Sequence, residues 1–371
     1  MTSAAPDGAG EPGEPLRGRF RDFQASLDRA DGGRRRRQSG RPATKGRGKG
    51  GREAGEQVNV PPVGFRSYYG RPILKAPVWK HDIPAYLFAG GLAAGTSLVA
   101  AGAQLTGRPG LRRVGRWAAL GAVSASTYFL IHDLGRPERF HHMLRVVKVT
   151  SPMSVGTWIL AAFGPAAGLA AVAELAPRLP RRGPLGLARR VVPPVGNTAG
   201  LVAATVAPAL ATYTGVLLAD TAVPSWHDAY PDLPFLFAGS ALAAASGVAL
   251  IAAPAAETGP VRRLALAGAA VELVGGRRLE RLGLTSEPYR QGRSGGLLRA
   301  GRVLLAAGVA AALLGRRSRV VSALSGAALL AASLATRFGV YEAGVASARD
   351  PKYTVVPQRE RLDQNGAAAR R

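Results

Sequence analysis

The sequence contains no cysteine among its 371 residues. The chain therefore has no disulfide bond, no thiolate nucleophile, and no sulfur ligand for an iron–sulfur cluster or a zinc ion. Any electron relay that works with this chain must belong to a partner.

Histidine is also scarce, and its placement restricts haem binding. The five histidines are His81, His132, His141, His142 and His227. A membrane haem is commonly held by histidines within the hydrocarbon region of facing helices, whereas these lie at or beyond the ends of the apolar segments. The sequence thus argues against a b-type haem, and the adjacent pair at 141 and 142 is interpreted as loop surface.

Acidic residues are few, because 23 Asp and Glu stand against 49 Lys and Arg, which gives a formal net charge of +26. In a soluble protein such a charge indicates nucleic acid binding. Here pairs of arginines instead separate apolar segments: Arg112-Arg113, Arg181-Arg182, Arg189-Arg190, Arg262-Arg263, Arg277-Arg278 and Arg316-Arg317. Short basic loops are typical of the flanks of membrane spans. The predicted partner surface is therefore a lipid bilayer and not nucleic acid.

Aliphatic residues are almost absent from residues 1–57, which are rich in Gly, Pro, Arg and Ser. Such a segment cannot build a core, so a disordered basic tail is predicted there. Residues 58–82 then lead into the membrane. Residues 346–371 form a C-terminal tail.

Between the tails, long apolar segments are compared with the roughly 20 residues that cross a bilayer. The predicted spans are about 83–106, 114–134, 152–177, 195–220, 234–257, 260–276, 297–315 and 319–341. The sixth is short, which leaves the count uncertain by one. The predicted fold is an all-α integral membrane protein with about eight transmembrane helices.

An internal repeat divides these spans into two units. Residues 210–219 (LATYTGVLLA) and 334–343 (LATRFGVYEA) are identical at six of ten positions. Weaker matches join the starts of the first and fifth spans and of the third and seventh, in the same order. We therefore predict two tandem four-helix bundles, residues 83–220 and 234–345, joined by a loop at 221–233. Tyr213 and Asp220 correspond to Arg337 and Gly344, so the second unit is expected to have lost polar content.

Polar residues at the span boundaries form the candidate site. If the spans alternate in direction, these boundaries lie on one side of the bilayer. The candidate residues are His81, Asp82, Tyr128, His132, Asp133, Tyr213 and Asp220. Spacings of four within the second span and seven within the fourth place their polar residues on one face of each helix.

Each candidate also has a structural alternative. His81 and Asp82 could anchor and cap the first helix, and Tyr128 could belong to an interfacial aromatic belt. His132 and Asp133, with Arg136 and Arg139, could form a salt-bridge cluster that ends the second helix. Asp220 could be a solvated residue at a helix end. Tyr213 lies deeper, where an unpaired hydroxyl is costly, which favours a functional role. The loop with Trp226, His227 and Asp232 is interpreted as a linker or a partner-docking surface.

Four motifs carry a family resemblance: WKHDIPAYLFAGGLAAG at 79–95, DLGRPERF at 133–140, SPMSVGTW at 151–158 and YTGVLL at 213–218. They resemble the NrfD/polysulfide-reductase membrane-subunit family over about residues 65–345. The resemblance implies a quinone-reactive anchor of eight or more helices, similar to the membrane arms of molybdopterin oxidoreductases. It also implies that the segment around His81 and Asp82 lines the quinone pocket, and that a ferredoxin-like iron–sulfur subunit exchanges electrons with the chain.

The expected function follows from the residues and this resemblance together. Quinol oxidation releases two protons and two electrons, so it needs polar groups on the quinone oxygens, a proton exit and an external electron acceptor. We expect menaquinone or ubiquinone as an exchangeable substrate, and an iron–sulfur partner together with a molybdopterin-type catalytic subunit. A transporter, a proton-conducting protein or a passive anchor without quinone turnover are the alternatives.

The expected location is the plasma membrane. The basic N-terminal tail favours cytoplasmic termini. The loops at 107–116 and 178–194 are also strongly basic, so the charge difference between the two sides is small.

Overall fold

The computed structural model describes residues 73–315 and 318–368, which belong to one compact unit and contain helices but no strand. The predicted tail at 1–57 and the first part of the 58–82 segment lie outside the described residues. The all-α class is therefore confirmed over the described part of the chain.

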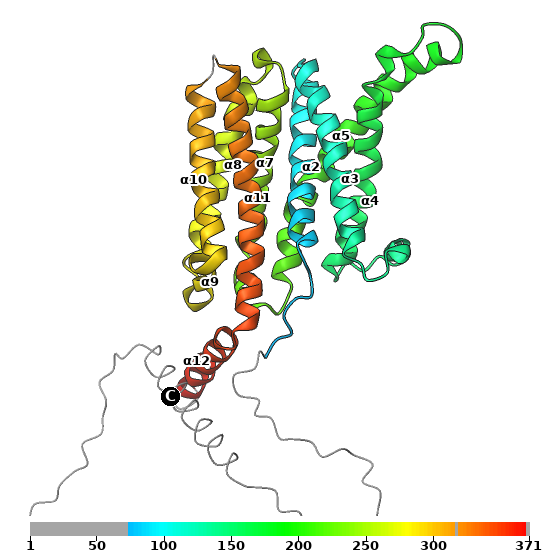
Figure 1. Ribbon diagram of the computed structural model, residues 1–371. Coiled ribbons are helices and arrows are strands. Elements are labelled where there is room, and N and C mark those ends of the chain that lie inside the picture. Colours follow the sequence, from blue (N-terminus) through cyan, green and yellow to red (C-terminus); the bar gives the residue numbers. More distant parts are fainter. Residues whose placement is uncertain (1–72, 316–317, 369–371) are drawn as a thin grey trace, which may run out of the picture. The chain divides into compact units, whose positions relative to one another are not determined.

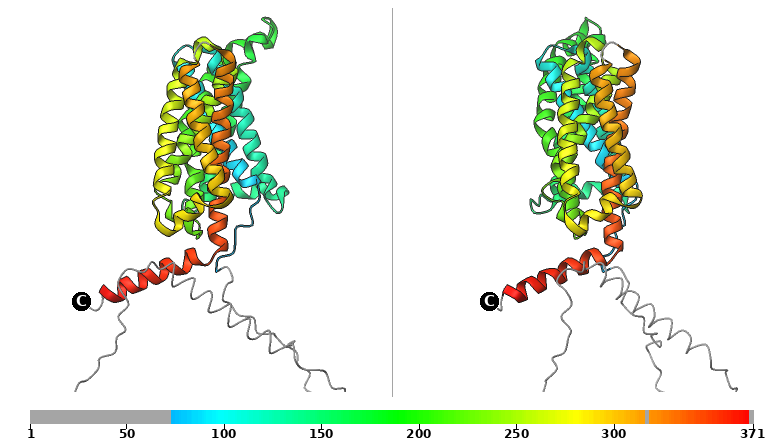
Figure 2. Two further views of the ribbon diagram at one scale, coloured as in Figure 1. Left: turned by 60° about the vertical axis from the view of Figure 1, so that its left-hand side comes forward. Right: turned by 90° about the vertical axis from the view of Figure 1, so that its left-hand side faces the viewer.

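Each predicted span coincides with one long helix. These helices are α2 (Asp82–Leu105), α3 (Pro109–His132), α4 (Pro152–Ala173), α5 (Gly183–Ala219), α7 (Leu233–Ala252), α8 (Gly259–Leu279), α10 (Gly292–Leu314) and α11 (Arg319–Arg349). They run side by side in Figures 1 and 2. The shorter elements are η1 (Pro137–Leu144), η2 (Ala176–Arg178), α6 (Pro224–Asp228), η3 (Ala255–Glu257), η4 (Gly283–Ser286), α9 (Glu287–Arg290) and α12 (Lys352–Ala368).

Six of the long helices of the described chain are long and apolar enough to cross a membrane, namely α2, α4, α5, α7, α10 and α11. The helices α3 and α8 have comparable lengths of 24 and 21 residues. They are less apolar because arginines occupy their first turns and, in α8, also the last turn. The described residues thus contain six candidate membrane spans by length and composition, as a multi-pass membrane protein requires.

The helix bounds differ most from the prediction at three places. Helix α5 begins at Gly183 and continues through Pro193 and Pro194, so part of the predicted 178–194 loop is helical. The first turns of α5 veer away from the other helices (Figure 1), as expected near proline residues. Helix α11 extends to Arg349, and α12 occupies most of the predicted C-terminal tail. The end of an apolar segment predicts where a helix leaves the membrane. The helix itself can continue beyond that residue, because its backbone hydrogen bonds do not depend on apolar side chains.

The helices pack in two neighbouring groups. In the first group, α2 and α4 each contact both α3 and α5. In the second group, α7 and α10 each contact both α8 and α11. Helix α2 also packs against α7. A Cβ atom at Gly95 in α2 would collide with the carbonyl oxygen of Ala241 in α7. Glycine is therefore needed at this crossing, because only a residue without a side chain lets the two backbones approach so closely.

Candidate functional site

An ion pair joins the start of α2 to the end of α3. Nδ1 of His132 lies 3.1 Å from Oδ2 of Asp82, and the two side chains are 58% and 22% exposed. Asp82 is the first residue of α2 and His132 is the last residue of α3, so the antiparallel packing of the two helices brings them together. The structure thus unites two candidates that are 50 residues apart.

Asp133 lies beside this pair, immediately after α3. Burial raises the pKa of Asp133, and the nearby carboxylate of Asp82 raises it further. A backbone hydrogen bond from Lys80 and the charges of His132 and Lys80 lower it, but the net shift is upward. Asp82, His132 and Asp133 therefore form one titratable cluster at this end of the helices.

Tyr128 and His81 lie at the border of the cluster. The ring of Tyr128 is 60% exposed and stacks on that of His132, with ring centroids 5.6 Å apart. His81 is exposed and stacks on Phe338 of α11, with centroids 6.4 Å apart. Tyr128 thus adjoins the ion pair, whereas His81 contacts the other group of helices.

A second pair of candidates lies deeper, at the contact of α2 and α5. The hydroxyl groups of Tyr86 and Tyr213 are hydrogen-bonded to each other, and the side chains are only 1% and 8% exposed. Tyr86 follows Asp82 by four residues in α2 and therefore lies on the same face, roughly 6 Å along the helix axis. Sequence reasoning placed Tyr213 in the site and missed Tyr86, although Tyr86 lies within the first motif.

A glycine of α4 makes room for the ring of Tyr213. A Cβ atom at Gly156 would overlap that ring. The motif at 151–158 and the motif at 213–218 therefore meet in space, and the missing side chain at position 156 fixes where Tyr213 lies.

Asp220 and the loop after α5 are placed differently from this cluster. Asp220 is exposed after the last residue of α5 and, with Asp228 and Tyr353, lines a groove beside α12. Trp226 has no exposed surface; its ring stacks on Trp79 at 6.1 Å, and its indole N–H donates to the carbonyl of Val340 at 2.8 Å. Of the two interpretations of this loop, linker or docking surface, the second is wrong for Trp226, because its buried ring fills the space left by the missing side chain of Gly344.

The structural alternative of a salt-bridge cluster with Arg136 and Arg139 is not found within the described chain. Both arginines are exposed on the segment around η1 and form no salt bridge with described residues. Asp133 interacts instead with Lys80 and His132. His141 and His142 are exposed in η1, with ring centroids 4.4 Å apart.

The second group of helices retains buried polar residues, so the expected loss of polar content there is wrong. Arg337 of α11 has no exposed surface; it donates to the carbonyl of Phe237 at 2.7 Å and lies 3.5 Å from Oγ1 of Thr214. Glu272 of α8 is 4% exposed and accepts a hydrogen bond from Thr336 at 2.7 Å. Sequence reasoning missed both, although a single charge inside an apolar segment signals function.

One family of known proteins matches the part of the chain that holds the Asp82–His132 pair and the Tyr86–Tyr213 pair. The family described as polysulphide reductase, NrfD, matches residues 73–262, from the segment before α2 to the first turn of α8. No curated protein matches the chain. Since the match spans just over half of the sequence, includes both residue pairs and agrees with the helical membrane fold, the chain belongs to the NrfD family.

Proposed function

We propose that the chain binds quinone and quinol as an integral membrane subunit of a multi-subunit oxidoreductase, and that it exchanges electrons with an iron–sulfur partner. The NrfD family comprises membrane subunits of quinone-linked oxidoreductases. The observation that carries the proposal is the pairing of Asp82 with His132 one helical turn from Tyr86 and Tyr213, all within the matched residues.

The ion pair suits proton acceptance from a quinol. When Nδ1 of His132 carries the proton that bonds Asp82, Nε2 is left as an acceptor for a quinol hydroxyl. Asp82 then stabilises the imidazolium that forms. Because the His132 side chain is 58% exposed, the proton can leave to the solution.

The tyrosine pair suits the other quinone oxygen. A phenolic hydroxyl donates one hydrogen bond and also accepts, so Tyr86 or Tyr213 can turn from its partner towards a quinone carbonyl. The low exposure of both rings keeps water away from that bond. Tyr128, stacked on His132, adds an exposed aromatic face beside the ion pair.

The electrons must leave through another protein because the chain contains no cysteine to hold an iron–sulfur cluster. We propose a ferredoxin-like iron–sulfur subunit, with a molybdopterin-type catalytic subunit behind it. The partner docks at the end of the helices that carries the start of α2, α9 and α12 (Figure 1), because the titratable cluster lies there. Menaquinone or ubiquinone is the exchangeable substrate.

We further propose that all of the long helices cross the plasma membrane, as two four-helix units with cytoplasmic termini. Equivalent glycines support the repeat: a Cβ atom at Gly156 of α4 would overlap the ring of Tyr213 of α5, and a Cβ atom at Gly301 of α10 would lie 3.2 Å from Oγ1 of Thr336 of α11. Thus α4 approaches α5, and α10 approaches α11, at a glycine. The arginines of α3 and α8 then lie near the membrane surfaces or inside the protein.

The decisive experiment is purification from native membrane, identification of the bound partners, and a quinol-oxidation assay. We expect an iron–sulfur partner, bound quinone, and quinol oxidation that falls at least about 100-fold in His132→Ala, the lower end of the range for general acid–base catalysis. His141→Ala, which changes an exposed histidine of η1, is the matched control. Recovery of the chain without such a partner or quinone favours a transporter or a passive anchor.

A further inference from the structure

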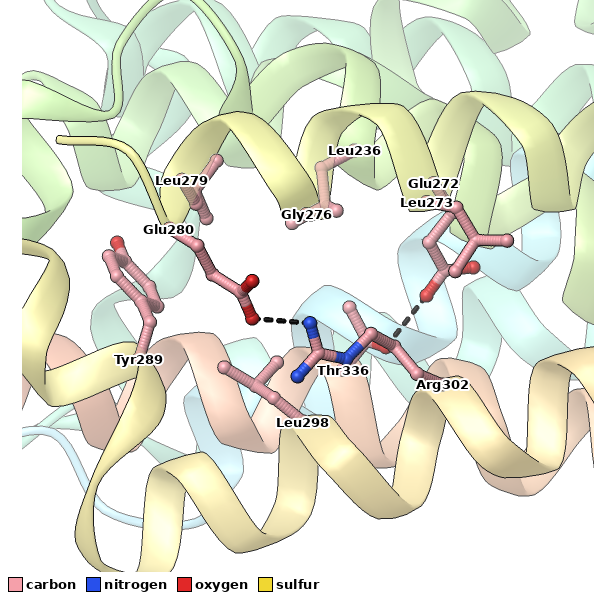
Figure 3. A pocket seen from close by; sticks show the side chains of 10 residues that line it. All are labelled: Leu236, Glu272, Leu273, Gly276, Leu279, Glu280, Tyr289, Leu298, Arg302 and Thr336. Carbon is pink, nitrogen blue, oxygen red and sulfur yellow. Dashed lines mark hydrogen bonds and ion pairs between the residues drawn. The ribbon is translucent and has the colours of Figure 1, made fainter.

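A small cavity lies between α8, α10 and α11, away from the tyrosine and histidine pairs. It is lined by Leu236, Glu272, Leu273, Gly276, Leu279, Glu280, Tyr289, Leu298, Arg302 and Thr336, which Figure 3 shows around it. Its volume of about 30 Å³ admits one or two water molecules and excludes a quinone ring. The cavity is therefore large enough for water, and carboxyl, guanidinium and hydroxyl groups in its lining could bond it.

The two ends of this cavity differ in solvent access. At one end the side chains of Glu280 and Arg302 form an ion pair and are 30% and 36% exposed. At the other end Glu272 is buried. Glu272 precedes Glu280 by eight residues in α8, which corresponds to roughly 12 Å of helix. The partly exposed Glu280–Arg302 ion pair and the buried Glu272 carboxyl group thus line the same cavity.

The carboxyl group of Glu272 is only partly bonded. Oε1 accepts from Oγ1 of Thr336 at 2.7 Å, whereas Oε2 has no hydrogen-bond partner. The hydroxyl of Ser240 interacts with the same carboxyl and is bonded to Ser333 at 2.8 Å. An unbonded buried oxygen is costly, and a water molecule in the adjoining cavity would remove that cost.

We propose that Glu272 exchanges protons with the solution through this water-filled cavity. The charged and titratable groups around it are Arg337 on α11, Arg302 on α10, Glu280 on its own helix, and Tyr289 on α9. Ionisable residues inside membrane proteins are rare and mark substrate, ion or proton paths. This proposal does not depend on quinone binding, and its test requires no turnover.

The test is infrared spectroscopy of the full chain, purified in lipid nanodiscs, during titration and during transfer from H₂O to D₂O. We expect a protonated-carboxyl C=O band that titrates, shifts in D₂O and is lost in Glu272→Gln. Glu280→Gln, which changes the other carboxyl of the cavity, should retain the band. Thr336→Val removes the hydrogen bond to Oε1 and should shift the band while keeping it.

A second variant tests the cavity as the route. A Cβ atom at Gly276 meets only Leu236 Cδ1, at 3.9 Å, so Gly276→Leu fills the cavity without a backbone collision. We expect deuterium exchange of the band to slow at least about tenfold, a further barrier of about 1.4 kcal/mol. Gly121→Leu, at a glycine with open space around it in α3, should exchange at the wild-type rate.

Two results would overturn the proposal. One is an identical set of spectra for the wild type and Glu272→Gln at every pH. The other is exchange in Gly276→Leu as fast as in Gly121→Leu. Because neither readout uses a quinone, failure here leaves the proposed quinone function standing, and failure of the quinol assay leaves this proposal standing.

Discussion

The hydroxyl groups of Tyr86 and Tyr213 are hydrogen-bonded to each other across 127 residues of sequence. Each is the side-chain partner of the other inside the contact of α2 and α5. This contact links the first and the last of the four family motifs, and it gives the buried end of the candidate quinone site its geometry.

Tyr213→Phe should slow quinol oxidation and lower stability. Removing one hydroxyl leaves the Tyr86 hydroxyl buried without its partner, which costs roughly 1–3 kcal/mol. The melting temperature and the quinol-oxidation rate of the purified complex measure the two effects. The double variant Tyr86→Phe/Tyr213→Phe should lose less stability than the sum of the single variants. Additive losses would contradict the hydrogen bond, and Tyr230→Phe, at an exposed tyrosine, is the control.

Gly156→Ala should displace the ring of Tyr213 because the added Cβ atom overlaps that ring. We expect destabilisation of about 1–3 kcal/mol, as for other overpacked positions, together with slower quinol oxidation. Gly164→Ala is a matched control in the same helix, since a Cβ atom there meets no atom within 4 Å. Equal rates and melting temperatures in the two variants would show that position 156 does not position Tyr213.

Asp133 should make stability depend on pH. Burial raises its pKa from the ordinary value of 3.8, so the folded state holds this proton more tightly than the unfolded state. The resulting stability is present below the unfolded pKa and is lost as pH rises through the folded pKa. As pH rises from about 4 through the raised pKa of Asp133, the melting temperature of the wild type should fall relative to that of Asp133→Asn. Asp363→Asn in α12 is the control, and parallel curves for wild type and Asp133→Asn would refute the prediction.

Glu174 should stabilise the other end of the first helices. Its carboxylate lies 2.9 Å from Nη1 of Arg116 and 2.8 Å from Nε of Arg112, and the side chains of Glu174 and Arg116 are 2% and 4% exposed. Glu174→Ala leaves a buried cation without its partner, so we expect a loss of roughly 3–5 kcal/mol. Thermal unfolding measures it.

Arg113 provides the comparison for this ion-pair cluster. Its Nε lies 3.8 Å from Glu174, and its side chain is 52% exposed, so Arg113→Ala should cost only about 0–1 kcal/mol. A comparable loss in Arg113→Ala and Glu174→Ala would mean that burial of Arg116 does not set the strength of the cluster.

Much of the fold is predictable from the sequence because apolar length and basic loops are local properties. Every predicted span coincides with a long helix, and the pair of Asp82 and His132 follows from helix ends that meet when neighbouring helices are antiparallel. The start of α5 was missed because Pro193 and Pro194 resemble loop residues, although the helix continues through them.

The interior contacts are less predictable because they depend on which face of each helix turns inward. Trp226 resembled a residue of an exposed loop, yet it is buried against Trp79. In the repeat, Arg337 occupies the position of Tyr213, which suggested that the polar site had been lost there. Its side chain is nevertheless buried and contacts Phe237 and Thr214. Composition gives the number of polar residues in a segment, but it does not show which residues of other helices contact them.

The sequence by itself determined a helical membrane protein of the NrfD family, with no cysteine and with polar residues at the helix ends, because hydropathy and motifs are encoded in short stretches of chain. Only the tertiary structure decided that Tyr86 is the partner of Tyr213, and that Glu272 lines the same cavity as Glu280 and Arg302. These relationships arise from the rotation and close approach of packed helices, which join residues far apart in the chain.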